Sequence, residues 1–504
     1  MKRGTRWFFL PAGLALLLFI AGCAGVDYYR EIRFDASQRL LGEQPLAAKE
    51  ARYLPCYELQ KTENLLTYRY LERGQPADAD ALFGVARIRL HEEAGREICS
   101  FANRLGGPVA SAGGVFRIVL ERNERGQVVA QHNRNHLDRP IEDETGVAEY
   151  RFTLDAAGRI ADAAFFDRQG KPATNRDGVA SVGRRYDAAG RLIRTIYRDG
   201  EGKPALDKNG VAGVWWEYDS AGRPASQLSY GLDERPAVSS RTGYAQIKYQ
   251  YDADGRETER RYLDATGAPV LARGKFPAVV RRWYEKNGLP RIERYFDAAD
   301  RPLADPVKGV AEVHWVYDEN GWRTAERYFD AQGQPAVSAE NGAAEIRWTF
   351  DHQGRPVRGA FFDAAGQPVT GAKDPVAAIE WRYDLHGNVI EERYLDVAGQ
   401  PMENPKNDIA AIQYRYDRRG YCTEISTHGP GGELKPWMNL RFARTVYTYD
   451  EFGNEVERML LDSAGRLADH PVFGYAVRRR HFDAQGYLAR TVYLDQAGRL
   501  VREE

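Results

Sequence analysis

The chain has 504 residues, in which 71 basic side chains are balanced by 72 acidic ones. This balance leaves no basic surface for nucleic acid or anionic lipid, so no nucleic-acid partner is expected. Aromatic residues make up 12 %, which argues against a disordered chain, and 29 Tyr with 49 Gly favour an all-β protein rich in turns.

The N-terminus has the layout of an export signal. Three basic residues among the first six precede an apolar run at residues 7–21. This run is shorter than a typical membrane-spanning helix. The run ends in Ile-Ala-Gly-Cys23, which resembles the bacterial lipobox. The resemblance implies a signal peptide at residues 1–22, a diacylglycerol on Cys23 and acylation, for example by palmitate, of the new N-terminus. The alternative is an ordinary signal peptide with an incidental cysteine.

The membrane is therefore the first expected partner, reached through the lipid on Cys23. Ala24 is not the Asp that resembles an inner-membrane retention signal, so the outer membrane is favoured, and its periplasmic and surface faces remain open. The other cysteines are Cys56, Cys99 and Cys422. A disulfide between Cys56 and Cys99 and two separate thiols are both open, and no cysteine has the spacing of a metal site.

Repeats organise the rest of the chain. Residues 23–113 carry weak repeats and are interpreted as a diverged N-terminal cap, because the end of a repeat stack has no neighbour to bury its face. A hairpin repeat array follows at residues 114–504. From Val147 an acidic residue recurs every 32 or 33 residues, with a glycine three positions later. The pairs include Asp155 and Gly158, Asp187 and Gly190, Asp318 and Gly321, and Asp384 and Gly387.

The unit at residues 310–342 illustrates the repeat. Residues 311–317 alternate apolar and mostly polar side chains, which predicts a half-buried strand. A tight turn, a second strand and a looser turn complete one β-hairpin. We expect the turn Asp to accept backbone N–H bonds and the turn Gly to take a positive φ that closes the hairpin with a bulge. The predicted fold is an all-β, elongated array, solenoid-like or a spiralling antiparallel sheet, of about 12 to 14 hairpins.

The core motif Tyr-Asp-x-x-Gly-Arg/Asn, as at residues 186–191 and 383–388, resembles the YD repeats of RHS-type proteins. The resemblance covers roughly residues 147–504. It implies hairpins that spiral into a long sheet and a binding role at the cell surface or envelope. The repeat here is longer than the usual YD unit, and the chain stops at Glu504 without a toxin domain, so we do not expect an encapsulating shell.

No residue pattern predicts catalysis. The acidic turn residue recurs in eleven units, whereas an active site is normally unique, so these carboxylates are interpreted as structural. His132 and His136 lie in a strand-turn segment and are read as exposed polar residues, and no nucleotide-binding or cofactor motif is present. The chain is therefore predicted not to be an enzyme, and no cofactor or metal is expected. Arg478 and Arg480, which replace apolar column residues, are interpreted as an exposed capping face.

The leading hypothesis is a non-enzymatic outer-membrane lipoprotein whose array presents an extended surface to an envelope protein. The alternative is a repeat protein that binds glycan, peptidoglycan or surface polysaccharide, through aromatic rings such as Trp315. The opposite strand face, with Glu312, Arg327 and Glu392, is expected to carry cross-strand charge pairs. A solvent-facing aromatic ladder would favour sugar, and a buried one would favour protein.

Overall fold

The computed structural model describes residues 27–34, 40–48, 51, 55–62, 65–72, 75–77, 82–93, 96–103, 106–450, 454–482 and 488–504. The predicted signal peptide and Cys23 lie outside these residues. All regular elements within them are β-strands, which confirms the predicted all-β array of hairpin repeats. No helix suited to crossing a membrane, by length and apolar character, occurs in this described part.

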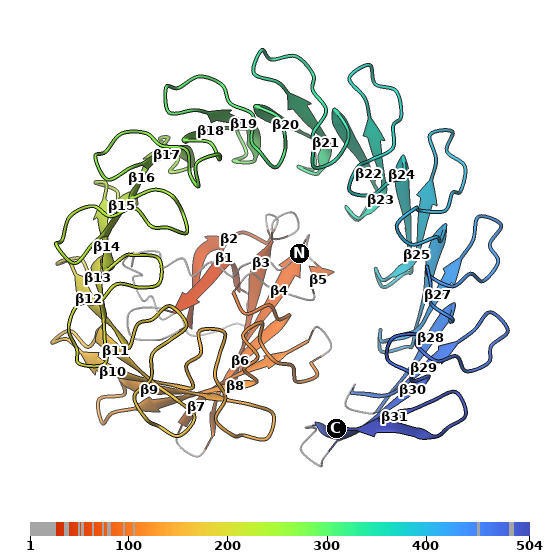
Figure 1. Cartoon of the computed structure of the whole chain (residues 1–504), viewed down its shortest axis with the longest axis horizontal. Helices are drawn as coiled ribbons and strands as arrows, with labels where there is room; N and C mark the ends of the chain where they lie inside the picture. The colour runs from red at the N-terminus through yellow and green to blue at the C-terminus, as the bar shows by residue number, and fades with distance from the viewer. Residues whose placement is uncertain are drawn as a thin grey trace. The chain divides into compact units, whose positions relative to one another are not determined.

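The chain divides into two compact units. Unit 1 comprises residues 1–282 and 296–301, and unit 2 comprises residues 283–295 and 302–504. Figure 1 labels the strands.

Unit 1 holds β1 (Asp27–Phe34), β2 (Leu40–Leu46), β3 (Cys56–Lys61), β4 (Leu65–Glu72), β5 (Gln75–Pro76), β6 (Arg87–Glu93), β7 (Arg96–Ala102), β8 (Arg117–Arg122), β9 (Val128–Arg134), β10 (Glu149–Leu154), β11 (Ile160–Phe166), β12 (Ser181–Tyr186), β13 (Leu192–Arg198), β14 (Gly213–Tyr218), β15 (Pro224–Tyr230), β16 (Gln246–Tyr251), β17 (Glu257–Leu263) and most of β18 (Val279–Tyr284).

Unit 2 holds most of β19 (Pro290–Phe296), followed by β20 (Glu312–Tyr317), β21 (Arg323–Phe329), β22 (Glu345–Phe350), β23 (Pro356–Phe362), β24 (Ala378–Tyr383), β25 (Val389–Leu395), β26 (Ala411–Tyr416), β27 (Cys422–His428), β28 (Arg444–Tyr449), β29 (Glu455–Leu461), β30 (Val477–Phe482), β31 (Leu488–Leu494) and β32 (Leu500–Glu503).

The strands of each repeat follow one another as antiparallel neighbours. The 24 strands from β8 to β31, at two per repeat, make twelve repeats, which lies within the predicted number. In the repeat of β22 and β23, Trp348 lies opposite Gly359 while Arg347 lies opposite Ala360. Because side chains alternate between the two sides of a strand, each repeat has an aromatic face, which carries Trp348, and a charged face, which carries Arg347.

The N-terminal strands of unit 1 extend the same antiparallel pairing into the region interpreted as a diverged cap. β1 pairs with β2 and β3, β3 pairs with β4, and β4 pairs with β6, which leads through β7 to β8. Their core contains Ile32, Tyr68, Ile88 and Phe101, all of which are buried.

Of the two alternatives left open for Cys56 and Cys99, a disulfide does not fit this order. Cys56 begins β3 and Cys99 lies in β7, with β4 and β6 between these two strands. Three strand spacings separate them by about 14 Å, whereas a disulfide spans about 7 Å at most between Cα atoms. Both side chains are buried where they stand.

Candidate functional site: repeat contacts and the loop rim

The turn residues singled out in the sequence all lie at first turns, the tight turns that join the two strands of a hairpin. Oδ1 of Asp155 accepts hydrogen bonds from the backbone N–H groups of Ala157 and Arg159, each at 2.9 Å. Gly158 has a φ of 80°, and a bulge follows Thr153 in the same hairpin. The same acceptor and positive-φ glycine occur at Asp187 and Gly190, Asp318 and Gly321, and Asp384 and Gly387.

The arginine of the motif joins one repeat to the next. Nε of Arg159 donates to Oδ2 of Asp155 at 2.7 Å, and its guanidinium lies 4.7 Å from the centre of the Tyr186 ring in the following repeat. The Tyr186 hydroxyl donates back to the Ile160 carbonyl at 2.9 Å. Arg355 and Tyr383 repeat these contacts in unit 2. Since a cation–π contact and a hydrogen bond both act between repeats, the motif stabilises the stack.

Turn contacts lower the pKa of the Asp155, Asp187 and Asp384 carboxyls in the folded chain. Burial acts to raise the pKa of Asp155, but the backbone N–H and the guanidinium of Arg159 outweigh it and hold the pKa below the usual value. At Asp384 the side chain and backbone of Asn388 oppose burial in the same way and lower the pKa. A carboxylate held ionised by turn contacts is poorly suited to act as a general acid at neutral pH.

Most repeats have a further turn that the repeat pattern in the sequence did not reveal. It lies in the second loop, which connects the second strand of one repeat to the first strand of the next. Oδ1 of Asp207 accepts from the backbone N–H groups of Asn209 and Val211, both at 2.9 Å, and Gly210 has a φ of 81°. Val211 is buried, as is its equivalent Val310. The sequence signal was a recurring Gly-Val-Ala, at residues 146–148, 178–180, 210–212 and 309–311.

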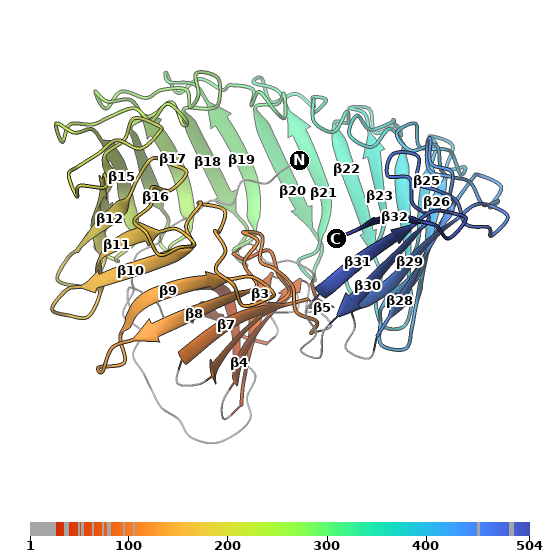
Figure 2. The ribbon, with the colours of Figure 1, turned by 60° about the horizontal axis from the view of Figure 1, so that its bottom comes forward.

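Backbone hydrogen bonds join the second loops of successive repeats. In unit 2 the N–H of Ala339 donates to the Lys308 carbonyl at 2.7 Å, and the N–H of Ala372 donates to the Asn341 carbonyl at 2.8 Å. A Cβ on Gly342 would lie 2.5 Å from the nitrogen of Ala372, so this close approach requires glycine. The loops of unit 2 consequently gather along one edge of its strands (Figure 2).

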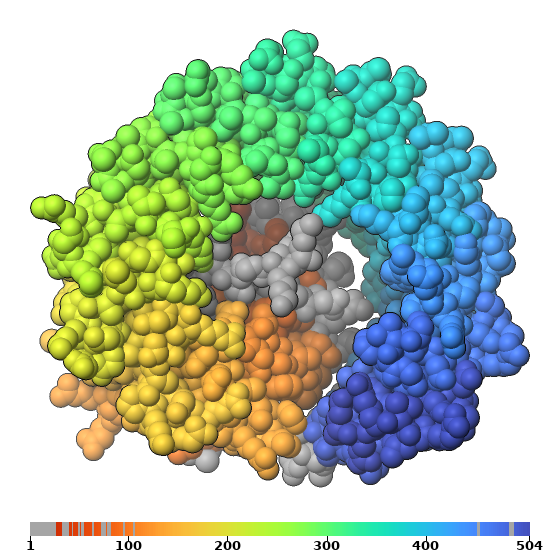
Figure 3. Space-filling model, in the orientation of Figure 1, coloured from red at the N-terminus to blue at the C-terminus, as the bar shows by residue number. Residues whose placement is uncertain are grey.

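The second loops of unit 2 expose large apolar side chains, and we call this set the loop rim. In the space-filling view these loops are separate knobs in the green-to-blue part of the chain (Figure 3). Single exposed apolar residues are ordinary on a protein surface, but recurrence on loops bonded to one another is characteristic of an interaction surface. The rim consists of Val307, Val337, Val397, Trp437, Met438, Val472 and Phe473, which are 41–78 % exposed.

The charged face carries the predicted cross-strand ion pairs. Arg327 and Arg347 both pair with Glu345, at 2.9 and 2.7 Å. Glu392 was assigned to this face wrongly, because the register places it opposite Trp381 on the aromatic face. There it accepts a hydrogen bond from Nε1 of Trp381 at 3.2 Å and one from the Tyr394 hydroxyl at 2.6 Å.

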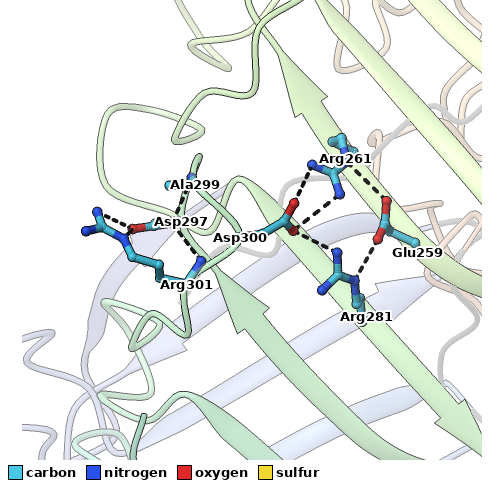
Figure 4. A network of polar contacts seen from close by, with 7 residues as sticks. All are labelled: Glu259, Arg261, Arg281, Asp297, Ala299, Asp300 and Arg301. Carbon is cyan, nitrogen blue, oxygen red and sulfur yellow. Dashed lines mark hydrogen bonds and ion pairs between the residues drawn. The ribbon is translucent and has the colours of Figure 1, made fainter.

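Figure 4 shows one of these charge networks, which lies within unit 1. Arg281 bridges Glu259 and Asp300, at 2.7 Å to each, and Arg261 reaches the same two acids at 3.1 and 3.2 Å. Asp300 stands where the second turn has glycine in other repeats, such as Gly333, and it keeps a left-handed φ of 58°. Hydrogen bonds from Arg261 lower the pKa of Asp300. The Asp300 carboxylate therefore links the second loop to the charged face through Arg261 and Arg281.

The aromatic face of unit 2 carries Trp315, Trp348 and Trp381 at equivalent positions, all half-buried. A Cβ on Gly359 would lie 3.2 Å from Trp348 and 3.4 Å from Trp381, so both rings pack against this glycine. The ladder is thus half-buried, rather than fully solvent-facing or fully buried.

The remaining candidates do not come together. His132 lies within 3.2 Å of Glu121 and 3.5 Å of Glu149, while His136 contacts the Phe116 ring, so the histidines have separate partners. Sγ of Cys422 donates to the Glu424 carbonyl at 3.5 Å, far along the chain from the N-terminal cysteines. Among the described residues no group of three or more His, Cys, Asp or Glu side chains is arranged to hold a metal ion.

The fold and the repeat contacts define an all-β array of hairpins joined by a Tyr-Asp-x-x-Gly-Arg motif. No protein family matches the chain, and neither does any curated protein sequence. Among solved structures it is similar to a chain of the Photorhabdus luminescens Tc holotoxin pore, with 12 % identity, 90 % of this chain and 24 % of that chain covered, and a TM-score of 0.35. A crystal structure of TcdB2-TccC3 without its hypervariable C-terminal region has 12 % identity, 87 % and 23 % coverage, and a TM-score of 0.30. The chain spans about a quarter of those chains, and nothing about ligand or partner follows from likeness at this level.

Proposed function

We propose that the chain is a non-enzymatic lipoprotein of the outer membrane, attached through Cys23, and that its hairpin array is a scaffold for a protein partner in the envelope. The observation that carries the proposal is the loop rim. It places apolar side chains, up to the 78 % exposed Val472, on loops of one unit. Apolar surface of this kind favours a protein over a highly polar ligand.

The non-enzymatic part of the proposal is supported by what the recurring groups do. The first-turn carboxylates accept backbone N–H bonds, and the pKa values of Asp155, Asp187 and Asp384 are lowered. Tyrosine hydroxyls such as that of Tyr186 donate to a neighbouring repeat. Groups engaged in these contacts hold the array together and leave little capacity for proton transfer.

Photo-crosslinking in cells tests the scaffold. A crosslinking amino acid at Val472 or Val337 should capture one protein in a near-equimolar complex. The matched control is Leu385, which is 98 % exposed but lies in a first turn, at the other end of the strands from the second loops. Equal capture from Leu385, or capture of many unrelated proteins from the rim, would show that the rim is not a specific interface.

The lipid anchor has its own test. In Cys23→Ser the chain should leave the membrane fraction and lose incorporation of labelled palmitate, because one acylated residue carries the attachment. Full palmitate labelling of this variant would show that the lipid is not on Cys23.

Glycan binding is the second candidate, and the half-buried Trp315, Trp348 and Trp381 favour it, since indole rings stack on sugar rings. Retention of full-length protein on purified peptidoglycan, lost in Trp348→Ala and kept in Val472→Ala, would support this role over the scaffold.

A further inference from the structure

We propose that Arg458, Arg478 and Arg480 form a binding site for a single oxyanion group, phosphate or carboxylate, on the aromatic face of β29 and β30. The proposal is independent of the loop rim, because it concerns a strand face rather than the second loops. It rests on three observations, which concern the register, the charge balance and the unpartnered nitrogen atoms of these arginines.

The register brings the three arginines to one face. Arg458 of β29 lies opposite Arg478 of β30, and Arg458 also lies opposite Tyr447 of β28. Arg480 follows Arg478 by two residues on the same strand and therefore points to the same side. It occupies the position that Trp348 and Trp381 hold in earlier repeats.

Within the described part of the chain, one acid pairs with this group of cations. Glu455 accepts a hydrogen bond from Arg458 at 3.1 Å and another from Arg478. Arg480 makes no hydrogen bond or ion pair with any residue that the structure describes. Counting the described residues that these groups contact, three guanidinium groups against one carboxylate leave a formal charge of +2. Burial and the neighbouring Arg478 lower the pKa of Arg480, which is the expected response of an uncompensated cation.

The nitrogen atoms of these arginines also have unused donor capacity. The Nε atoms of Arg458, Arg478 and Arg480 are buried and make no hydrogen bond within the described chain. The side chain of Arg478 is only 12 % exposed, so this group is not an open capping face as expected from the sequence. Buried donors that carry charge are costly when unpaired, and the planar fork of guanidinium matches phosphate and carboxylate oxygens.

A related cluster in unit 1 has two arginines on one acid, with Val280 at the position of Arg478, and the Nε atom of its Arg260 is likewise buried without a hydrogen bond. Glu257 pairs with Arg260 at 2.8 Å and with Arg282 at 2.7 Å. Arg282 holds the repeat position of Arg480. Arg282 is paired with the Glu257 carboxylate, whereas Arg480 has no carboxylate partner among the described residues. Arg282 is therefore the matched control for a substitution at Arg480.

Titration calorimetry of the full-length protein in detergent tests the site, with inorganic phosphate and acetate as separate probes at ionic strength fixed with NaCl. We expect about one equivalent of anion to bind the unmodified chain and Arg282→Gln, and binding at least about tenfold weaker in Arg480→Gln. The stronger probe identifies the preferred oxyanion. In NaCl alone Arg480→Gln should be as stable as the unmodified chain or more so, since it removes an uncompensated charge.

Three results would overturn the proposal. The first is an absence of binding of both probes to the unmodified chain. The second is binding that Arg480→Gln retains. The third is a lower thermal stability of Arg480→Gln than of Arg282→Gln that neither anion changes, and either of the last two would give Arg480 a purely structural role.

Discussion

Removing one tyrosine hydroxyl tests whether the Tyr-Asp motif holds neighbouring repeats together. In Tyr317→Phe the ring stays, but the hydroxyl that donates to the Pro290 carbonyl at 2.7 Å is lost. Burial raises the pKa of Tyr317 to about 12, so the hydroxyl is protonated and donates at neutral pH. One such bond contributes about 1 kcal/mol, which corresponds to about a fivefold change in the equilibrium for local opening.

Hydrogen exchange measured by mass spectrometry resolves this change by segment. Amides of β20 and of the adjoining β19 should exchange about fivefold faster in Tyr317→Phe, while those of β30 and β31 should be unchanged. Phe350 is the matched control, because it holds the same position one repeat later without a hydroxyl. Phe350→Tyr should slow exchange in its own repeat, where Arg323 supplies the equivalent carbonyl. Unaltered exchange in Tyr317→Phe, or faster exchange spread evenly over the chain, would refute the reasoning.

Three further predictions concern the turns and the second loop. Asp300→Asn keeps a residue that tolerates the left-handed backbone but removes the charge facing Arg261 and Arg281. Urea unfolding at low salt should show a free energy of unfolding lower by less than about 1 kcal/mol, and this difference should disappear near 1 M salt. A decrease that does not depend on salt would contradict the ion-pair role. Because the folded pKa values of turn residues such as Asp155 lie below the ordinary 3.8, their stabilisation is complete above that value and is lost as pH falls through the folded pKa. Circular dichroism in an acid titration should therefore show the array weakening below pH 4, and a more stable array at pH 3 than at pH 6 would be inconsistent with this linkage. Val310→Ala removes two methyl groups from a fully buried site and should lower the free energy of unfolding by about 2 kcal/mol, whereas Leu385→Ala at an exposed first turn should change it little.

The sequence predicted those features that depend on one residue type at a fixed position. Asp318 and Gly321 identified a first turn because the carboxylate acceptor and the positive φ are both tied to residue identity. The turn in the second loop was missed because its acceptor varies, from Asp207 to Asn175 and His470 in other repeats, and only the following Gly-Val-Ala is recurrent.

Features set by register or long-range packing could not be read from local pattern. Glu392 looked like a partner for the charged face because arginine follows it, yet antiparallel pairing places it opposite Trp381. Whether Cys56 and Cys99 can form a disulfide depended on the strand order. Two strands lie between them, which places them too far apart. The surroundings of Arg480 depended on which acids face it from β29, and no sequence spacing encodes that.

Departures from the repeat are where a binding function is best sought in this array. At a regular position the side chain bonds to a neighbouring repeat, as Tyr186 does to the Ile160 carbonyl of the preceding repeat, and has little bonding capacity left for a ligand. Arg480 breaks the pattern by placing a cation without an acid where other repeats place a ring. Phe473 breaks it by adding an exposed ring to a second loop, where its neighbour His470 lies 4.5 Å away between ring centres.

The two departures lie on different surfaces of unit 2, so Arg480→Gln should leave crosslinking from Val472 intact, and a substitution on the rim should leave anion binding intact. Loss of both activities in either single variant would mean that the two surfaces serve one ligand.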